Sequence, residues 1–221
     1  MRFKVLLATM LMAATSISAV DAQDRTGLYL RGTQHQRGGD AIAQETAILF
    51  IYDGCKCKAY DQSKITAHDT CQVEAYGQAT VTAKAETKIR AFDTTRVIAS
   101  NSAVVDANGS ANVLADQKVT VNAHGNVNVN ADDEVVIIAD GNCTIFARDK
   151  SKVTATGNCI VMALGQSTVT ATGNVHVKAY DQAKVNAKGE CHIEAWGTAE
   201  VTTDGKCEVE THDTSVKVNK S

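Results

Sequence analysis

The chain of 221 residues contains no proline. Proline has no backbone N–H group, so it is excluded where every N–H enters a hydrogen-bonded ladder between strands. Beyond the N-terminal region the sequence also lacks an apolar run of the roughly 18 residues that a membrane-spanning helix needs. These two absences favour a β-rich protein without a membrane span.

A strong charge of either sign is missing as well. The formal net charge is −3, and it becomes −4 when residues 1–22 are removed, because Arg2, Lys4 and Asp21 leave with them. A cationic surface of the kind that binds nucleic acid or anionic lipid is therefore not expected. We exclude nucleic acid and anionic membranes as the main partners.

The first 22 residues have the pattern of a secretory signal peptide. Arg2 and Lys4 precede the apolar run VLLATMLMAATSISAV, and Val20-Asp21-Ala22 supplies the small residues that a signal peptidase recognises. We expect cleavage near Ala22. The predicted location is the periplasm, the cell surface or the medium of a bacterium.

A repeat of eight residues occupies most of the remaining chain. Alanine recurs at every eighth position from Ala59 to Ala195, and Val or Ile stands two residues before nearly every one of these alanines. Alternation of apolar and polar residues indicates strands with one buried face. Gly, Asp or Asn two residues after the alanine predicts a turn, because these residues tolerate positive φ. The pattern spans 21 units, from Ala47 to the unit beginning at Cys207.

Such a chain is predicted to coil into a parallel β-solenoid. One flat sheet of this many strands would leave its apolar face in water, and open sheets rarely exceed about ten strands. The cysteines and aromatic residues recur at sixteen-residue spacing, which favours coils of sixteen residues with two faces and about ten rungs. Three-sided coils of 24 residues are the alternative. We expect residues 23–46 to cap the N-terminal end, residues 47–218 to form the solenoid with a register slip of one residue near Val216, and residues 219–221 to form a tail.

Six of the seven cysteines form pairs that are sixteen residues apart: Cys55 and Cys71, Cys143 and Cys159, and Cys191 and Cys207. Adjacent rungs would bring the Cα atoms of each pair to roughly 4.8 Å, within the range for a disulfide, while the Cβ separation is longer than disulfides prefer. Cysteine can equally serve as a small buried residue. Disulfides and buried thiols are both retained as interpretations, and Cys57 has no partner.

A polar cluster is expected on one face near the C-terminus. Its outward residues are His176, His192, Glu194, Glu208 and Glu210. Imidazoles and carboxylates bind transition metals, but Lys178 falls among them and nothing organises a closed site. We interpret the cluster as a solvated polar face and predict no metal and no cofactor.

Enzymatic and ice-binding functions have little support in the sequence. Every predicted turn has three residues and no insertion interrupts the register, so no loop is long enough to build a catalytic cleft. The Thr-x-Thr pairs that an ice-binding face needs begin at Thr80 and Thr168, an odd number of units apart. They would therefore lie on opposite faces. We expect a protein that is not an enzyme.

An apolar column is the outward feature that best indicates a partner. At sixteen-residue spacing it contains Ile98, Leu114, Asn130, Phe146 and Met162, with Ile160 beside Met162 and Leu164 near the edge of the face. Such a surface marks a contact with a protein partner or with a second copy of the chain. The apolar members, Ile98, Leu114, Phe146, Ile160, Met162 and Leu164, are the predicted partner-binding residues.

Aromatic residues at the edges of the coils suggest a second function. They follow the alanine of their unit and are Tyr60, Tyr76, Phe92, Tyr180 and Trp196. Aromatic rings can stack on sugars, so a glycan-binding module is the alternative function. Shielding of the corners from water is the simpler interpretation of these rings.

The repeat, as in AYDQAKVNA (179–187) and AYGQATVTA (75–83), resembles the short-repeat β-helical segments of bacterial surface and phage-associated proteins. It is also similar to the passenger domains of adhesin-type autotransporters. The resemblance covers residues 47–218 and implies a rigid structural or adhesive role without catalytic residues.

Overall fold

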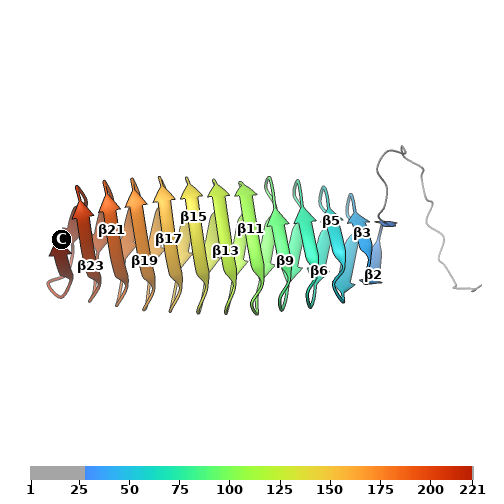
Figure 1. Ribbon diagram of the computed structural model, residues 1–221, viewed down its shortest axis with the longest axis horizontal. Coiled ribbons are helices and arrows are strands. Elements are labelled where there is room, and N and C mark those ends of the chain that lie inside the picture. Colours follow the sequence, from blue (N-terminus) through green and yellow to red (C-terminus); the bar gives the residue numbers. More distant parts are fainter. Residues whose placement is uncertain (1–27, 221) are drawn as a thin grey trace, which may run out of the picture.

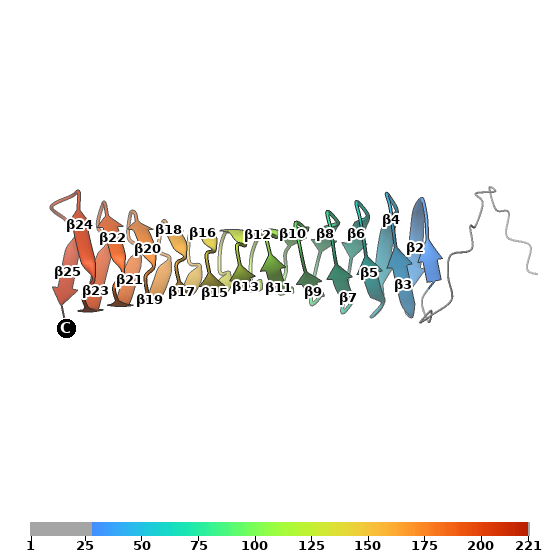
Figure 2. The same cartoon turned by 90° about the horizontal axis from the view of Figure 1, so that it is seen from above.

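The computed structural model describes residues 28–220. The predicted signal peptide lies outside these residues. Within them the protein is a rod of two parallel β-sheets that lie face to face, and it contains no helix in this part of the chain (Figures 1 and 2). The predicted β-solenoid is thereby confirmed.

The odd-numbered strands form one sheet of 13 strands, the odd sheet, and the even-numbered strands form one of 12, the even sheet. The odd sheet comprises β1 (Leu28–Leu30), β3 (Asp40–Ala43), β5 (Lys56–Ala59), β7 (Gln72–Ala75), β9 (Lys88–Ala91), β11 (Val104–Gly109), β13 (Thr120–Gly125), β15 (Val136–Gly141), β17 (Lys152–Gly157), β19 (Thr168–Gly173), β21 (Lys184–Gly189), β23 (Glu200–Gly205) and β25 (Lys217–Lys220). The even sheet comprises β2 (Thr33–Arg37), β4 (Ile48–Tyr52), β6 (Lys64–Ala67), β8 (Thr80–Ala83), β10 (Arg96–Ala99), β12 (Asn112–Ala115), β14 (Asn128–Ala131), β16 (Thr144–Ala147), β18 (Ile160–Ala163), β20 (His176–Ala179), β22 (His192–Ala195) and β24 (Glu208–Thr211).

The register between strands fixes the length of a coil. Val97 of β10 pairs with Val113 of β12, and Val105 of β11 pairs with Val121 of β13, so each residue lies beside the residue sixteen positions later. Two strands complete one coil, which confirms the two-sided arrangement and excludes the 24-residue alternative.

The solenoid has about twelve turns instead of ten because both ends contribute additional strands. Residues 28–43, within the segment expected to cap the rod, form β1, β2 and β3, and these strands extend both sheets. The register of β1 and β2 is irregular, because Leu28 pairs with Ala41 and Thr33 pairs with Ile48, whereas β3 pairs with β5 at the regular spacing of sixteen. At the other end Val201 pairs with Val218, which is the predicted slip of one residue.

The core is one continuous column of small and branched side chains between the sheets. Valine and isoleucine at the centre of each strand are almost fully buried, as at Ile137 and Ile145 with 0% exposure, and the alanines lie beside them. Burial of each such branched side chain contributes about 1.5–3 kcal/mol relative to exposure. The remaining inward position takes Ala, Val, Ser, Thr or Cys. In several coils a hydroxyl or thiol there donates to a backbone carbonyl three residues earlier, as Thr87 Oγ1 does to Lys84 O at 2.7 Å, whereas Ser63 Oγ and Ser167 Oγ are buried without a hydrogen-bond partner.

Two kinds of corner connect the sheets. At the first corner the chain passes from the odd to the even sheet, and at the second it passes back. From β11 onward a glycine of positive φ ends each odd strand as far as β23, forming a ladder at the first corner whose members are Gly109, Gly125, Gly141, Gly157, Gly173, Gly189 and Gly205. Aspartates in the left-handed conformation predominate at the second corner, as at Asp133 and Asp149.

Candidate functional site

The predicted apolar column lies in register on the outer face of the even sheet. Ile98 pairs with Leu114, and Phe146 pairs with Met162, while Asn130 separates the two pairs. Ile98 and Leu114 are 37% and 36% exposed, and Phe146 and Met162 are half-buried. We call these four residues together with Ile160, which is 41% exposed, the apolar stripe.

Leu164 is not part of this face. It follows the end of β18 and lies at the second corner, one coil before Tyr180. The expected position near the edge of the face is correct, but its neighbours are the corner residues and not the stripe.

A groove runs between the stripe and the second corner. Its apolar wall is formed by Ile98 and Leu114, and its polar wall by Asp116, Asp132 and Arg148. Arg148 Nη1 lies 2.9 Å from Asp132 Oδ1, so one of the carboxylates is already paired. The groove therefore has one apolar wall and one polar wall in which Asp116 adds negative charge.

Two exposed apolar residues on β15, in the middle of the odd sheet, were missed by the sequence analysis. Val136 and Ile138 on β15 are 39% and 48% exposed. They pair with Lys152 and Thr154 on the next odd strand, so the apolar surface does not continue there. Comparing residues at sixteen-residue spacing through Ile138 would have identified both residues. It would also have shown that polar residues stand beside them on the neighbouring strands.

The corner aromatics form two separate stacks. Tyr60, Tyr76 and Phe92 stack at the first corner, with ring centroids 5.2 and 4.9 Å apart. Tyr180 and Trp196 stack at the second corner at 4.6 Å, and His212 continues that stack at 4.3 Å from Trp196. The rings are nearly parallel, so each inner ring has its faces covered by its neighbours. This geometry agrees with shielding of the corners.

Three residues of the predicted polar cluster converge on the even sheet. His176 Nε2 lies 2.8 Å from Glu194 Oε1, and the rings of His176 and His192 meet edge to face at 4.8 Å. Lys178 Nζ lies 3.2 Å from the same Glu194 oxygen. The hydrogen bond from His176, and secondarily the Lys178 ammonium, hold the pKa of the Glu194 carboxyl below its usual range. Glu210, on the adjacent strand β24, pairs with Glu194 of β22.

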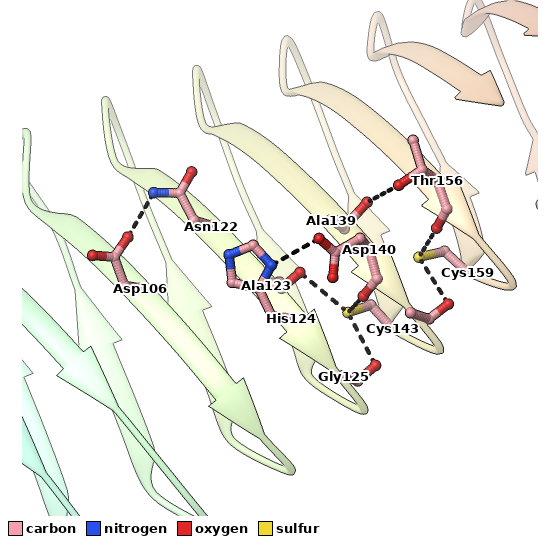
Figure 3. A network of polar contacts seen from close by, with 11 residues as sticks. Asp106, Asn122, Ala123, His124, Gly125, Ala139, Asp140, Cys143, Thr156 and Cys159 are labelled. Atoms are coloured by element: carbon pink, nitrogen blue, oxygen red, sulfur yellow. Dashed lines mark hydrogen bonds and ion pairs between the residues drawn. The ribbon is translucent and has the colours of Figure 1, made fainter.

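The seven cysteines, all within the described residues, are free thiols. Those expected in pairs lie on adjacent coils. In the middle pair the thiols donate to backbone carbonyls near the ends of odd strands: Cys143 Sγ to Asp140 O at 3.2 Å, and Cys159 Sγ to Thr156 O at 3.1 Å (Figure 3). Hydrogen bonding between these two thiols, together with burial, raises the pKa of Cys143. Burial raises the pKa of Cys57 to about 12. Closure of the three pairs into disulfides stays a prediction.

An asparagine ladder at the first corner was also missed. Asn126, Asn142, Asn158 and Asn174 follow successive ladder glycines, and each side-chain amide donates to the oxygen of the one before it at 3.1–3.3 Å. The Gly-Asn pairs at sixteen-residue spacing are the signal that could have identified this ladder. Beside it His124 Nδ1 lies 2.9 Å from Asp140 Oδ2 (Figure 3).

The turn aspartates have a structural explanation. Besides adopting positive φ, several of them accept a hydrogen bond from the backbone of the preceding coil, as Asp93 does from Gly77 N–H at 3.0 Å and Asp181 from Gly165 N–H at 3.1 Å. The Thr-x-Thr pairs lie on β8 of the even sheet and on β19 of the odd sheet, which are the opposite faces that were expected.

A concavity at the second corner is lined by turn residues only: Asn101, Ser102, Gln117, Lys118, Asp133, Glu134, Asp149 and Lys150. Desolvation, followed by repulsion from Asp116 and Asp149, raises the pKa of Asp133. Three carboxylates, those of Asp133, Glu134 and Asp149, lie between Lys118 and Lys150 along this groove, so it has no single charge for a ligand to match.

Comparison with known proteins returned no relative. No protein-family model matches the chain, and no match was found among the curated proteins or the solved structures. Within residues 28–220 no helix has the length and apolarity to cross a membrane.

Proposed function

We propose that the protein is an exported, non-enzymatic structural or adhesive β-solenoid that makes contacts through the apolar stripe. The observation that carries this proposal is the alignment of outward apolar side chains on four of five consecutive coils of one sheet, with Asn130 on the middle coil. Water-exposed apolar surface of this kind is stabilised when another surface covers it. Export rests on the predicted signal peptide, and the adhesive role also draws on the resemblance to adhesin-type repeats.

A non-enzymatic role is supported by the connections between strands. From β3 to β25 each connection has between two and five residues. Catalytic clefts on solenoids require longer loops that bring several functional groups over one face. The concavities here are shallow grooves along the corners and faces of the rod.

The partner that we propose for the stripe is a second copy of the chain. A two-fold axis that lies in the plane of the contact, parallel to the even sheet, would place one stripe against the other, so that a single surface serves both subunits. The groove margin at Asp116 would lie outside this apolar contact and remain in water.

Light scattering across a range of protein concentrations tests this proposal. Wild-type protein is expected to associate, and the double variant Phe146→Ser, Met162→Ser is expected to remain monomeric. Ile138→Ser is the matched control, because it removes an exposed apolar side chain from the opposite sheet. If the double variant still associates, or if the wild-type protein is monomeric at every concentration, the apolar stripe is not an interface and the proposal is wrong.

Glycan binding has weaker support because the corner rings are stacked on one another. A glycan array probed with the wild-type protein and with Tyr180→Ala, Trp196→Ala tests it directly. Glycan binding that disappears in this variant while association is unchanged would favour the carbohydrate-binding function instead.

A further inference from the structure

We propose that His176, His192 and Glu194 form a binding site for a divalent transition metal of the zinc class on the outer face of the even sheet. One ligand atom from each residue lies within 4.8 Å of the other two. No other group of at least three His, Cys, Asp or Glu side chains in the described part of the chain meets this condition. The solenoid itself brings them together, because His176 and His192 occupy the same column and Glu194 lies two residues further along β22.

The donor set matches this class of ion. Two imidazole nitrogens and one carboxylate oxygen are ligands that zinc accepts, at bond lengths of about 2.0–2.2 Å. Ligand atoms around a tetrahedral zinc ion are then about 3.4 Å apart. His176 Nε2 and Glu194 Oε1, now 2.8 Å apart, would need to separate by only about half an ångström to admit the ion. The ion would take the place of the proton that these two atoms share, and that proton would be released to solvent.

A fourth ligand is available on the next strand. Glu208 Oε2 lies 3.6 Å from His192 Nδ1, and its side chain is 84% exposed, so it can rotate toward the site without disturbing the core. With Glu208 bound, the ion would connect β20, β22 and β24 near the C-terminal end of the even sheet.

The surroundings of the cluster are asymmetric. Toward the N-terminus the preceding strand presents Ile160 and Met162, which are apolar. Toward the C-terminus the next strand presents the carboxylates of Glu208 and Glu210. Among the described residues, Lys178 is the one positively charged side chain recorded in contact with the three proposed ligands. Its ammonium group would compete with the metal ion for Glu194. Removal of this ammonium group should therefore strengthen metal binding.

Isothermal titration of the purified chain with Zn²⁺ tests the proposal. One ion per chain is expected. Binding should weaken by more than about tenfold in His176→Gln and in His192→Gln, since loss of a ligand costs at least as much as loss of a residue that supports one. His124→Gln is the matched control, because it disrupts an exposed His–carboxylate pair that has no second imidazole, and it should bind as the wild type does. Lys178→Gln should bind more tightly than the wild type.

Cobalt(II) distinguishes this site from the cysteines. Imidazole and carboxylate ligands give weak visible bands, whereas thiolate ligands add intense near-ultraviolet absorption. The proposal predicts the visible bands alone, and predicts that they are lost in His176→Gln. Thiolate absorption, binding that survives in His176→Gln and in His192→Gln, or no binding by a wild-type protein whose circular dichroism shows β-structure would each overturn the proposal.

Discussion

The glycine ladder offers a controlled test of how closely the coils are packed at the first corner. A Cβ atom added at Gly157 would lie 2.9 Å from Gly141 O and 3.1 Å from Gly141 N, while one added at Gly173 would lie no closer than 3.7 Å to its neighbour. Both glycines have positive φ, +79° and +96°. The substitutions Gly157→Ala and Gly173→Ala therefore share the cost of a left-handed backbone and differ in the steric clash.

The expected magnitudes follow from these two contributions. A left-handed conformation costs an L-residue about 1–2 kcal/mol. Overpacking against atoms that cannot move adds about 1–3 kcal/mol, and Gly141 O is held in place because it accepts the Asn158 N–H at 2.8 Å. Gly157→Ala is thus expected to lower the free energy of unfolding by about 2–5 kcal/mol and Gly173→Ala by about 1–2 kcal/mol.

Urea unfolding followed by circular dichroism would measure both variants against the wild type. Hydrogen exchange at the Asn158 amide provides a local readout, and exchange there should be faster in Gly157→Ala than in Gly173→Ala. Equal destabilisation by the two substitutions would refute the reasoning, because it would mean that neighbouring coils are not in contact at this corner.

Three further predictions concern the core, the thiols and the response to acid. Ile137→Ala should lower the free energy of unfolding by about 2–5 kcal/mol, whereas Ile138→Ala, on the exposed face of the same strand, should lower it by less than about 1 kcal/mol in the same urea assay. Iodoacetamide at pH 8 should label the half-buried Cys207 but leave Cys57, whose pKa is about 12, unlabelled until the protein is unfolded, as read by mass spectrometry. The pKa of Glu194 is lower in the folded protein than the ordinary value of 4.5, so its contribution to stability is present above that pH and is lost as the pH falls below it. Urea midpoints should therefore fall more steeply below pH 4.5 in the wild type than in Glu194→Gln, and parallel slopes would contradict this.

The coil could be predicted because its determinants are local and repeated. Alternation around Val97 or Val113 indicates a strand, the glycine or aspartate that follows indicates a turn, and the sixteen-residue spacing of Cys143 and Cys159 indicates which strands are neighbours. Each repeat supplies the same evidence independently, so errors at single positions do not accumulate.

The end of the rod could not be predicted in the same way. Residues 28–37 lack the eight-residue pattern, and their pairing offsets differ from sixteen, as shown by Leu28 with Ala41 and Thr33 with Ile48. Strand pairing there is specified by contact with the first regular coils, which a search for periodicity does not detect.

The sequence indicated the members of the apolar stripe and of the His–Glu cluster, but not their side-chain contacts. Sixteen-residue spacing places His192 beside His176, whereas the contact between His176 and Glu194 runs diagonally across two strands. Whether His176 contacts Glu194 depends on the rotamers of these two side chains. The same spacing should have revealed the asparagine ladder from Asn126 to Asn174, which was missed because polar turn residues were read only as turn formers.

Hydrogen-bond scalar couplings measured by NMR on deuterated protein would test the central claim most directly. In a two-sided coil of sixteen residues, the nitrogen of Asn142 should correlate with the carbonyl carbon of Gly125, and that of Trp196 with Ala179, since these pairs are joined at 2.7 and 2.9 Å. Correlations that instead connect each amide with a carbonyl about 25 residues earlier would contradict the two-sided solenoid. Both the stripe and the metal site would then lose their basis.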